Sequence, residues 1–316
     1  MLLADRHVPG MLAAFDLGTR GRLSHGPVAS GRLGSIWRLD TDPGSWAVKH
    51  VEDATDSEIV EITDGAAFQE AAHAAGVSTP AVRRTGAGEV IATVADTRVR
   101  LHEWVDLRPP ALDLDPAELG RLVAGLHLVE FTGTVGTNRW YEEPVGEDRW
   151  RGIVRGLRAR GAPFSDELEA LVPPLVALEA FLGGSPRSLR TCHRDLWADN
   201  IRRTASGALC VFDFDNAGLA DPSQELALVI VEFSGDDGAR GRAIQDAYTE
   251  AGGPGRVDGP RDFAMVIAQL AHIVEEGCRR WLAATTDAGR ADNEGWIREF
   301  LDRPLTPAVV ERLLAD

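Results

Sequence analysis

The residues best suited to chemistry in this chain form a short polar stretch that is followed by an apolar strand. His193, Asp195 and Asn200 lie close together, and Asp213 ends the apolar run Val211-Phe212. The spacing His-x-Asp-x4-Asn, with an aspartate at the end of a later strand, is typical of a phosphoryl-transfer site. An ordinary polar loop between helices is the alternative interpretation.

Each polar side chain of this pattern has its own predicted task. Asp213 and the amide oxygen of Asn200 are hard oxygen ligands that suit Mg²⁺. Asp195 is left to orient an acceptor hydroxyl and to take its proton. Because Asp195 and Asn200 are five residues apart on one loop, one can face a substrate while the other faces a metal ion. We expect His193 to hold the backbone of this loop.

The basic residues of the chain are strongly biased towards arginine. Of 33 basic residues, 32 are arginine, and Lys49 is the only lysine. Lysine carries a compact ammonium, whereas arginine carries a planar fork, so a retained lysine favours a site that needs a point charge. A leftover surface lysine is the alternative.

Composition excludes several classes of protein. With 49 acidic residues, the chain has a formal net charge of −16, which argues against a broad basic face for nucleic acid. Its apolar runs are too short to span a bilayer. The three cysteines, Cys192, Cys210 and Cys278, have neither a disulfide nor a zinc spacing, which favours a reducing compartment. We therefore expect a cytoplasmic monomer or homodimer that binds neither nucleic acid nor membranes.

The elements that must position the polar residues fall into two parts. The first hundred residues predict an antiparallel sheet with one helix, because short strand-like runs alternate with turn residues. The remainder predicts mostly helices, the first of which opens at Asp115-Pro116. The pattern is an α+β fold with two lobes, expected at residues 1–106 and 107–316. The predicted strands are 22–28, 35–40, 45–51, 89–94 and 97–105, and the predicted helices are 56–75, 115–129, 165–182, 226–233, 262–284 and 293–301.

Four segments together resemble the aminoglycoside phosphotransferase family, the small-molecule branch of the protein-kinase-like fold. CHRDLWADNI (192–201) resembles its catalytic loop, and VFDFDNAGLADPSQELA (211–227) resembles its metal-binding strand and the helix that follows. GSWAVKH (44–50) resembles the strand that bears the ATP lysine, and ELGRLVAGLH (118–127) resembles the first helix of the large lobe. The matches extend from residue 30 to about residue 233.

The resemblance implies a small-molecule kinase that uses ATP (or GTP) and Mg²⁺. Asp195 would be its catalytic base, and Asn200 and Asp213 would be its metal ligands. Lys49 would bridge the α- and β-phosphates, a task that suits a point charge.

The remaining nucleotide contacts are implied mainly through the backbone. Gly31, Gly34 and Ser35 lie where the family has its nucleotide loop, and glycine lets a backbone approach phosphates closely. The carbonyl of Glu103 and the amide of Val105 would face the adenine edge.

The chain departs from the family pattern in two places. The acidic helix partner of Lys49 would be Glu70, although Gln69 or Glu61 could occupy that position. Arg194 stands where the family often has glycine. The chain also lacks an activation segment, since residues 215–221 are too few for one, which argues against a protein substrate.

Acceptors in this family are often polycationic, and acidic pocket walls favour such molecules. We expect an antibiotic acceptor, an aminoglycoside or a basic peptide, whose phosphorylation confers resistance. The alternatives are a metabolic kinase for choline, a sugar or an amino alcohol, and a non-catalytic nucleotide-binding regulator. The candidate substrate residues are Asp199, Asp215, Glu232 and Trp281.

The assignment of Lys49 gives a first prediction. We expect Lys49→Arg to raise the KM for ATP or to lower turnover, because a planar guanidinium cannot replace a compact ammonium on the phosphates. Steady-state kinetics of both proteins test this, and unchanged constants would refute the assignment.

Overall fold

The computed structural model describes residues 3–31, 34–51, 54–184 and 186–315. Contacts divide the chain into two compact units, neither of which is one continuous stretch. The first unit comprises Met1–Ala111, Val129–Val135 and His193–Gly218. The second comprises Leu112–Leu128, Gly136–Cys192 and Leu219–Asp316. The predicted catalytic loop and metal strand thus belong to the same unit as the sheet.

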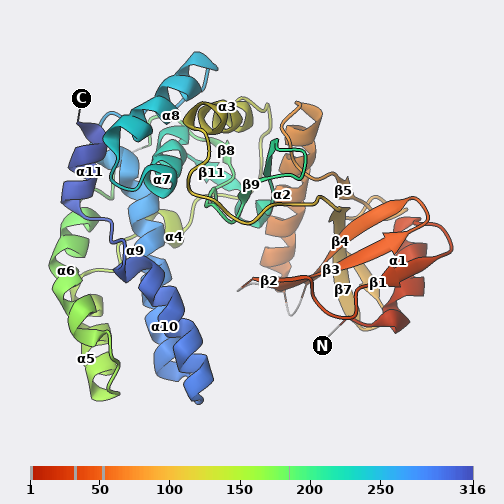
Figure 1. Ribbon diagram of the computed structural model, residues 1–316, viewed down its shortest axis with the longest axis horizontal. Helices are drawn as coiled ribbons and strands as arrows, with labels where there is room; N and C mark the ends of the chain where they lie inside the picture. Colours follow the sequence, from red (N-terminus) through yellow and green to blue (C-terminus); the bar gives the residue numbers. More distant parts are fainter. Residues whose placement is uncertain (1–2, 32–33, 52–53, 185, 316) are drawn as a thin grey trace. The chain divides into compact units, whose positions relative to one another are not determined.

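The sheet of the first unit is antiparallel throughout, as its short strands and turns predict (Figure 1). Within the described residues its central order is β1-β3-β4-β7-β5, with β2 paired to β3 and β6 paired to β7. The tight turn between β6 and β7 passes through Ala95, whose φ of 55° is left-handed. The strands are β1 (Gly21–Leu23), β2 (Ala29–Gly31), β3 (Gly34–Thr41), β4 (Gly44–Val51), β5 (Val82–Arg83), β6 (Ala92–Val94) and β7 (Thr97–Glu103).

One face of this sheet is covered by a helix that the sequence prediction omitted. Helix α1 (Val8–Phe15) presents Met11 and Phe15 to a core that includes Val48 and Leu101. The apolar residues of α1 recur at the spacing of one helical face, but the helix has only 8 residues. The short 3-10 helix η1 (Asp5–His7) leads into it. The expectation of a single helix in this part is therefore corrected.

Helix α2 (Asp56–Ala74) matches the predicted helix closely. Thr55 caps it by accepting a bond from the backbone amide of Glu58, whose side chain returns to the Thr55 amide, and Gly76, with a φ of 87°, follows its end. Gly65 of α2 lies against the 3-10 turn η2 (Phe214–Asn216). The approach is so close that a Cβ at this position would lie 2.2 Å from the Phe214 carbonyl oxygen.

The second unit is mostly helical, so the predicted α+β class is confirmed. Its core forms around α9, where Trp281 and Cys278 pack with Trp150, Phe164 and Leu168. Its helices are α3 (Pro116–His127), α4 (Arg139–Glu142), α5 (Glu147–Ala159), α6 (Ser165–Glu179), α7 (Pro222–Ser234), α8 (Gly238–Glu250), α9 (Ala264–Ala283), α10 (Asp287–Leu301) and α11 (Pro307–Leu314), with η3 (Pro260–Phe263) before α9.

Four of these helices, α4, α5, α8 and α11, were not predicted. Both α5 and α8 contain two glycines, and glycine weakens the intrinsic preference for helix. Packing against neighbouring helices overrides that preference here. No described helix is both long enough and apolar enough to cross a membrane.

Helices α3 and α8 pack with their backbones in close contact, which gives a stability prediction. A Cβ at Gly120 would lie 2.4 Å from the Ile244 carbonyl oxygen, whereas one at Gly152 of α5 would meet nothing nearer than 3.9 Å. We expect Gly120→Ala to lower the free energy of unfolding by about 1–3 kcal/mol, as overpacking does. Gly152→Ala is the matched control and should be neutral or stabilising, since alanine favours helix. Urea unfolding measures both, and an unaffected Gly120→Ala would contradict the close packing.

Candidate active site

The loop that carries Asp195 is fixed by the two residues before it. The buried His193 lies with its Nε2 3.1 Å from the Phe212 carbonyl oxygen and its ring 4.5 Å from that of Phe214. Arg194 is 2% exposed and donates through Nε to the Asn216 carbonyl oxygen at 2.6 Å. Gly218 leaves room for this guanidinium, since a Cβ there would lie 2.4 Å from it. His193 therefore ties the loop to the backbone of Phe212, outside the loop, and Arg194 adds a second anchor.

Asp195 and Asn200 are joined directly within this loop. The side-chain amide of Asn200 donates to the backbone carbonyl oxygen of Asp195 at 2.9 Å and to its Oδ2 at 2.8 Å. Since the amide nitrogen is used in this way, the amide oxygen of Asn200 is the atom left to accept a cation. The loop thus orients both side chains with one pair of bonds.

The surroundings of Asp195 change its affinity for protons. Burial, and then the negative charge of Asp213, raise the pKa of Asp195 to about 7, against the hydrogen bonds from Asn216 and Asn200 and the charge of Lys49. A carboxyl group with a pKa near neutrality is better matched to accepting a proton than an ordinary aspartate.

A β-hairpin brings Asp213 beside the catalytic loop. Strands β9 (Ile201–Arg203) and β10 (Leu209–Val211) pair antiparallel, with Val211 opposite Ile201. The Phe212 amide continues this pairing by donating to the Asn200 carbonyl oxygen at 3.2 Å. Asp213 then adopts a left-handed φ of 64°, which turns the chain into η2. Asn200 and Asp213, the two predicted magnesium ligands, therefore come from adjacent strand ends, and both carry oxygen atoms of the hard kind that Mg²⁺ prefers.

Lys49 and Arg100 lie opposite each other on neighbouring strands, β4 and β7. Val48 and Leu101, the adjacent cross-strand pair, point to the other face and are buried in the core beneath α1. The alternation of strand side chains therefore assigns the cations to one face and the apolar residues to the other. The sequence prediction missed Arg100, because the register that places it opposite Lys49 is a property of the folded sheet.

Two carboxylates meet these two cations. The Lys49 Nζ lies 2.7 Å from Asp213 Oδ1 and 2.6 Å from Asp215 Oδ2. The Arg100 guanidinium donates to the same Asp215 Oδ2 and lies 3.9 Å from Asp213 Oδ1. Burial alone would raise the pKa of Asp215. The charges and hydrogen bonds of Arg100 and Lys49 nevertheless hold this pKa well below its usual range. Lys49 therefore lies between two carboxylates, and Asp215 lies between two cations.

The predicted helix partner of Lys49 is engaged elsewhere. Both carboxylate oxygens of Glu70 are bound by Arg84, at 2.7 and 2.6 Å. Gln69, the alternative, is 2% exposed and donates to the Pro80 carbonyl oxygen at 2.7 Å. The expectation of a pair between Lys49 and Glu70 is therefore corrected, because the carboxylates that reach Lys49 come from Asp213 and from the turn after it.

The nucleotide-loop residues occupy a strand turn. Gly31 ends β2 and pairs with Gly34 at the start of β3, and the adjacent pair is Ser30 with Ser35. The two residues between the glycines, Arg32 and Leu33, lie outside the described residues. The phosphate contacts assigned to Gly31, Gly34 and Ser35 remain predictions.

The hinge residues lie where β7 ends. Glu103 is the last residue of β7, and its amide donates to the Ala81 carbonyl oxygen at 2.8 Å. Near this position, burial, and then the charge of Arg100, lower the pKa of His102 to about 3, so His102 is neutral at physiological pH. The adenine contacts predicted for Glu103 and Val105 remain predictions.

The candidate substrate residues have different surroundings. Asp199 is exposed on the catalytic loop, and Glu232 is half-buried in α7. Trp281 is only 4% exposed and packs edge-on against Phe164, with ring centroids 5.7 Å apart. Trp281 is therefore a core residue, and stacking on a substrate is not open to it. Asp215 is bound by Lys49 and Arg100, and its predicted place in a substrate wall remains a prediction.

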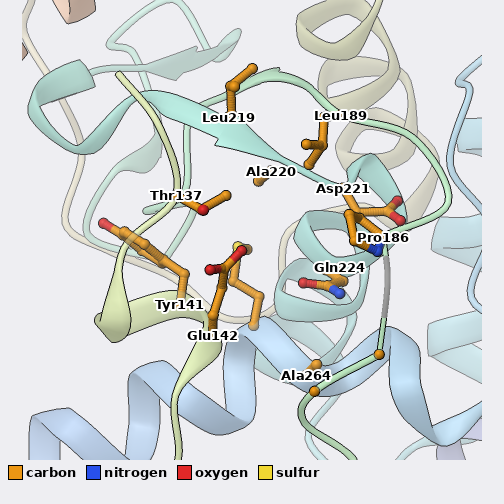
Figure 2. A pocket seen from close by; sticks show the side chains of 13 residues that line it. Thr137, Tyr141, Glu142, Pro186, Leu189, Leu219, Ala220, Asp221, Gln224 and Ala264 are labelled. Atoms are coloured by element: carbon orange, nitrogen blue, oxygen red, sulfur yellow. The ribbon is translucent and has the colours of Figure 1, made fainter. Parts of the chain in front are cut away.

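The second unit contains a cavity of about 260 Å³. Figure 2 shows Tyr141 and Glu142 on one side of it and Asp221 and Gln224 on the other. Asp221 accepts bonds from the backbone amides of Ser223 at 2.9 Å and Arg187 at 2.6 Å, whereas Glu142 is exposed. The described residues that line the cavity include no basic side chain.

The second unit also gathers His127, Cys192 and Glu225 closely enough to hold a metal ion. Both ring nitrogens of His127 already lie in hydrogen bonds, with Glu225 Oε2 and with the Tyr248 hydroxyl, each at 2.8 Å. A buried polar network of this kind fixes the packing of α3, α7 and α8.

Comparison with known proteins gives a consistent result. A family model described as the phosphotransferase enzyme family matches residues 25–260, while a search of curated proteins returns no match. A spectinomycin phosphotransferase in complex with ADP and spectinomycin aligns with a TM-score of 0.69 and 13% identity over 99% of this chain and 98% of that one. A microcompartment-associated aminopropanol kinase aligns with a TM-score of 0.62 and 17% identity over 98% of each chain. An amicoumacin kinase in complex with AMP-PNP and Ca²⁺ aligns with a TM-score of 0.61 and 12% identity over 97% and 96%. At these identities the likeness shows the fold.

The backbone of Arg194 gives a second stability prediction. Its φ of 62° is left-handed, a conformation that glycine adopts freely and that costs other residues about 1 kcal/mol. We expect Arg194→Ala and Arg194→Gly both to lower the free energy of unfolding, because both lose the guanidinium bonds. The alanine variant should be the less stable by about 1 kcal/mol. Urea unfolding compares the two directly, and a less stable glycine variant would show that the backbone conformation is not what separates them.

Proposed function

The chain belongs to the phosphotransferase enzyme family, and from that premise we propose that it transfers the γ-phosphoryl group of ATP (or GTP) to a hydroxyl of a small, cationic molecule. The observation that carries the proposal is the shared arrangement of the Asp195–Asn200 pair and the Lys49–Asp213 pair in one unit. Phosphoryl transfer requires a base, a metal site and a cation, and these four side chains supply them.

Asp195 acts as the base in this proposal. Its carboxylate orients the acceptor hydroxyl and accepts its proton as the new bond to phosphorus forms. The hydrogen bond from the Asn200 side-chain amide to Asp195 Oδ2 holds the carboxylate in one orientation. A fixed orientation lowers the entropic cost of reaching a productive geometry.

Asp213 and the Asn200 amide oxygen would hold the magnesium ion, which neutralises phosphate charge when bound. Lys49 adds a point charge from the sheet. Because β9 and β10 are paired next to these residues, Asn200 and Asp213 are positioned by the same hairpin.

One feature supports a cationic acceptor. The formal net charge of the chain is −16. Acidic surroundings raise the local concentration of cations.

The acceptor class we favour is an antibiotic, whose phosphorylation would confer resistance. Structural neighbours whose names include spectinomycin and amicoumacin support this choice. The neighbour named as an aminopropanol kinase supports the alternative, a metabolic kinase for an amino alcohol. A non-catalytic regulator is disfavoured, because Lys49, Asp195, Asn200 and Asp213 are all present.

The fourth prediction tests the reaction and the base together. The purified chain is incubated with ATP, Mg²⁺ and a panel of aminoglycosides, basic peptides, choline, amino alcohols and neutral sugars, and products are followed by the mass of one added phosphoryl group. We expect at least one cationic acceptor to be phosphorylated. Asp195→Asn should lower its turnover about a hundredfold or more, the range of general-base catalysis.

The controls separate chemistry from folding. Asp195→Asn should bind ATP and should unfold cooperatively like the parent chain. Full turnover by Asp195→Asn would show that another group is the base. Phosphorylation of neutral sugars in preference to every amine would remove the cationic class.

A further inference from the structure

The side chain that positions Lys49 comes from an unexpected place. The helix residue expected to do so, Glu70, is bound by Arg84. Resting on the proposed function, we propose that Asp215, gripped by Arg100, positions the ammonium of Lys49 for the nucleotide phosphates. Asp215 and Arg100 are positioning residues, since each acts through Lys49.

Two like charges are paired across neighbouring strands. Lys49 and Arg100 are directly opposite each other in the β4–β7 ladder, where two positive charges repel. The Lys49 side chain is 15% exposed and that of Arg100 is 4% exposed, so water screens this repulsion poorly. An anion is needed between them, and Asp215 Oδ2 accepts hydrogen bonds from both.

Asp215 and Asp213 differ in their contacts with Arg100. Both contact Lys49, but the Arg100 guanidinium donates to Asp215 and only approaches Asp213, at 3.9 Å. The Asp213 side chain is also the more exposed, 37% against 26%. Asp213 is therefore the carboxylate available to a ligand, while Asp215 is held in a structural pair with a buried arginine.

Helix α2 packs against the turn that carries Asp215. Gly65 touches the backbone of η2 so closely that a Cβ would lie 2.2 Å from the Phe214 carbonyl oxygen. Phe68 also packs against Phe214, with ring centroids 5.6 Å apart. Helix α2 thus supports the turn η2. The carboxylate that reaches Lys49 belongs to this turn and not to the helix. The same five-residue segment, 211–215, then supplies both the predicted metal ligand and the partner of Lys49.

The experiment exploits the fact that Lys49 is the only lysine. Selective ¹⁵N-lysine labelling of the full chain gives a single side-chain ammonium signal, and hydrogen bonds from an ammonium to carboxylates slow its exchange with water. We expect Asp215→Asn to raise this exchange rate at least about tenfold, since one charged acceptor is lost. Asp40→Asn is the matched control: it removes an exposed aspartate that binds Arg38 on β3 and should leave the Lys49 signal unchanged.

Kinetics supply the second readout. Asp215→Asn should raise the KM for ATP about tenfold or more with a smaller change in kcat, because the ammonium no longer meets the phosphates in a fixed position. In a Lys49→Met background the same substitution should add little, because its effect passes through Lys49. Arg100→Lys should retain more ATP affinity than Arg100→Met, and this pair keeps the test valid if Asp215→Asn does not fold.

The outcomes distinguish this inference from the proposed function. If Asp215→Asn leaves the Lys49 signal and the KM unchanged while Glu70→Gln alters both, the helix carboxylate is the partner and the inference fails. Equal losses in the presence and absence of Lys49 would also overturn it. If the parent chain binds ATP but phosphorylates no acceptor, the proposed function fails, and the ammonium signal and ATP affinity still decide the inference.

Discussion

The cross-strand placement of Lys49 and Arg100 is the constraint on which the candidate site depends. Two cations on one face of a sheet repel each other, so the first unit must bring carboxylates to them. Asp213 and Asp215 meet this requirement from a segment more than a hundred residues later in the chain. Ion pairs, as well as packing, therefore hold the sheet against the segment 211–215.

The rest of the first unit holds those carboxylates in place. His193 and Arg194 fix the catalytic loop to the carbonyl oxygens of Phe212 and Asn216, which lie on either side of Asp213 and Asp215. Gly65 supports the same turn from α2. Because these anchors contact the backbone on either side of Asp213 and Asp215, we expect a change at any of them to displace both the predicted base and the predicted metal ligands.

Sequence reasoning placed the polar residues of the candidate site together because they are close in the chain, and their roles stay predictions. His193, Asp195, Asn200 and Asp213 lie on one loop and one hairpin, so their order in the chain already determines that they can meet. The antiparallel sheet and α2 followed from turn residues, caps and periodicity, and the α+β class was correct. Helices α5 and α8 were missed because their glycines conceal a helix that tertiary packing stabilises.

The remaining errors concern long-range choices between similar side chains. Glu70, Asp213 and Asp215 are all carboxylates at plausible positions. Only the ion pairs of the folded chain show that Asp213 and Asp215 reach the two cations, whereas Glu70 is bound by Arg84. Trp281 lies on a helix face that could border either a pocket or the core. Its ring contact with Phe164 shows that it belongs to the core. Composition could not make either choice, since it counts charges and rings without pairing them. The arginine bias did identify Lys49, because a point charge shared by two carboxylates is a task that a planar guanidinium performs differently. The same arginine bias hid the neighbouring cation, because Arg100 is one of 32 arginines. Only its burial and its position opposite Lys49 distinguish it, and both are properties of the folded chain.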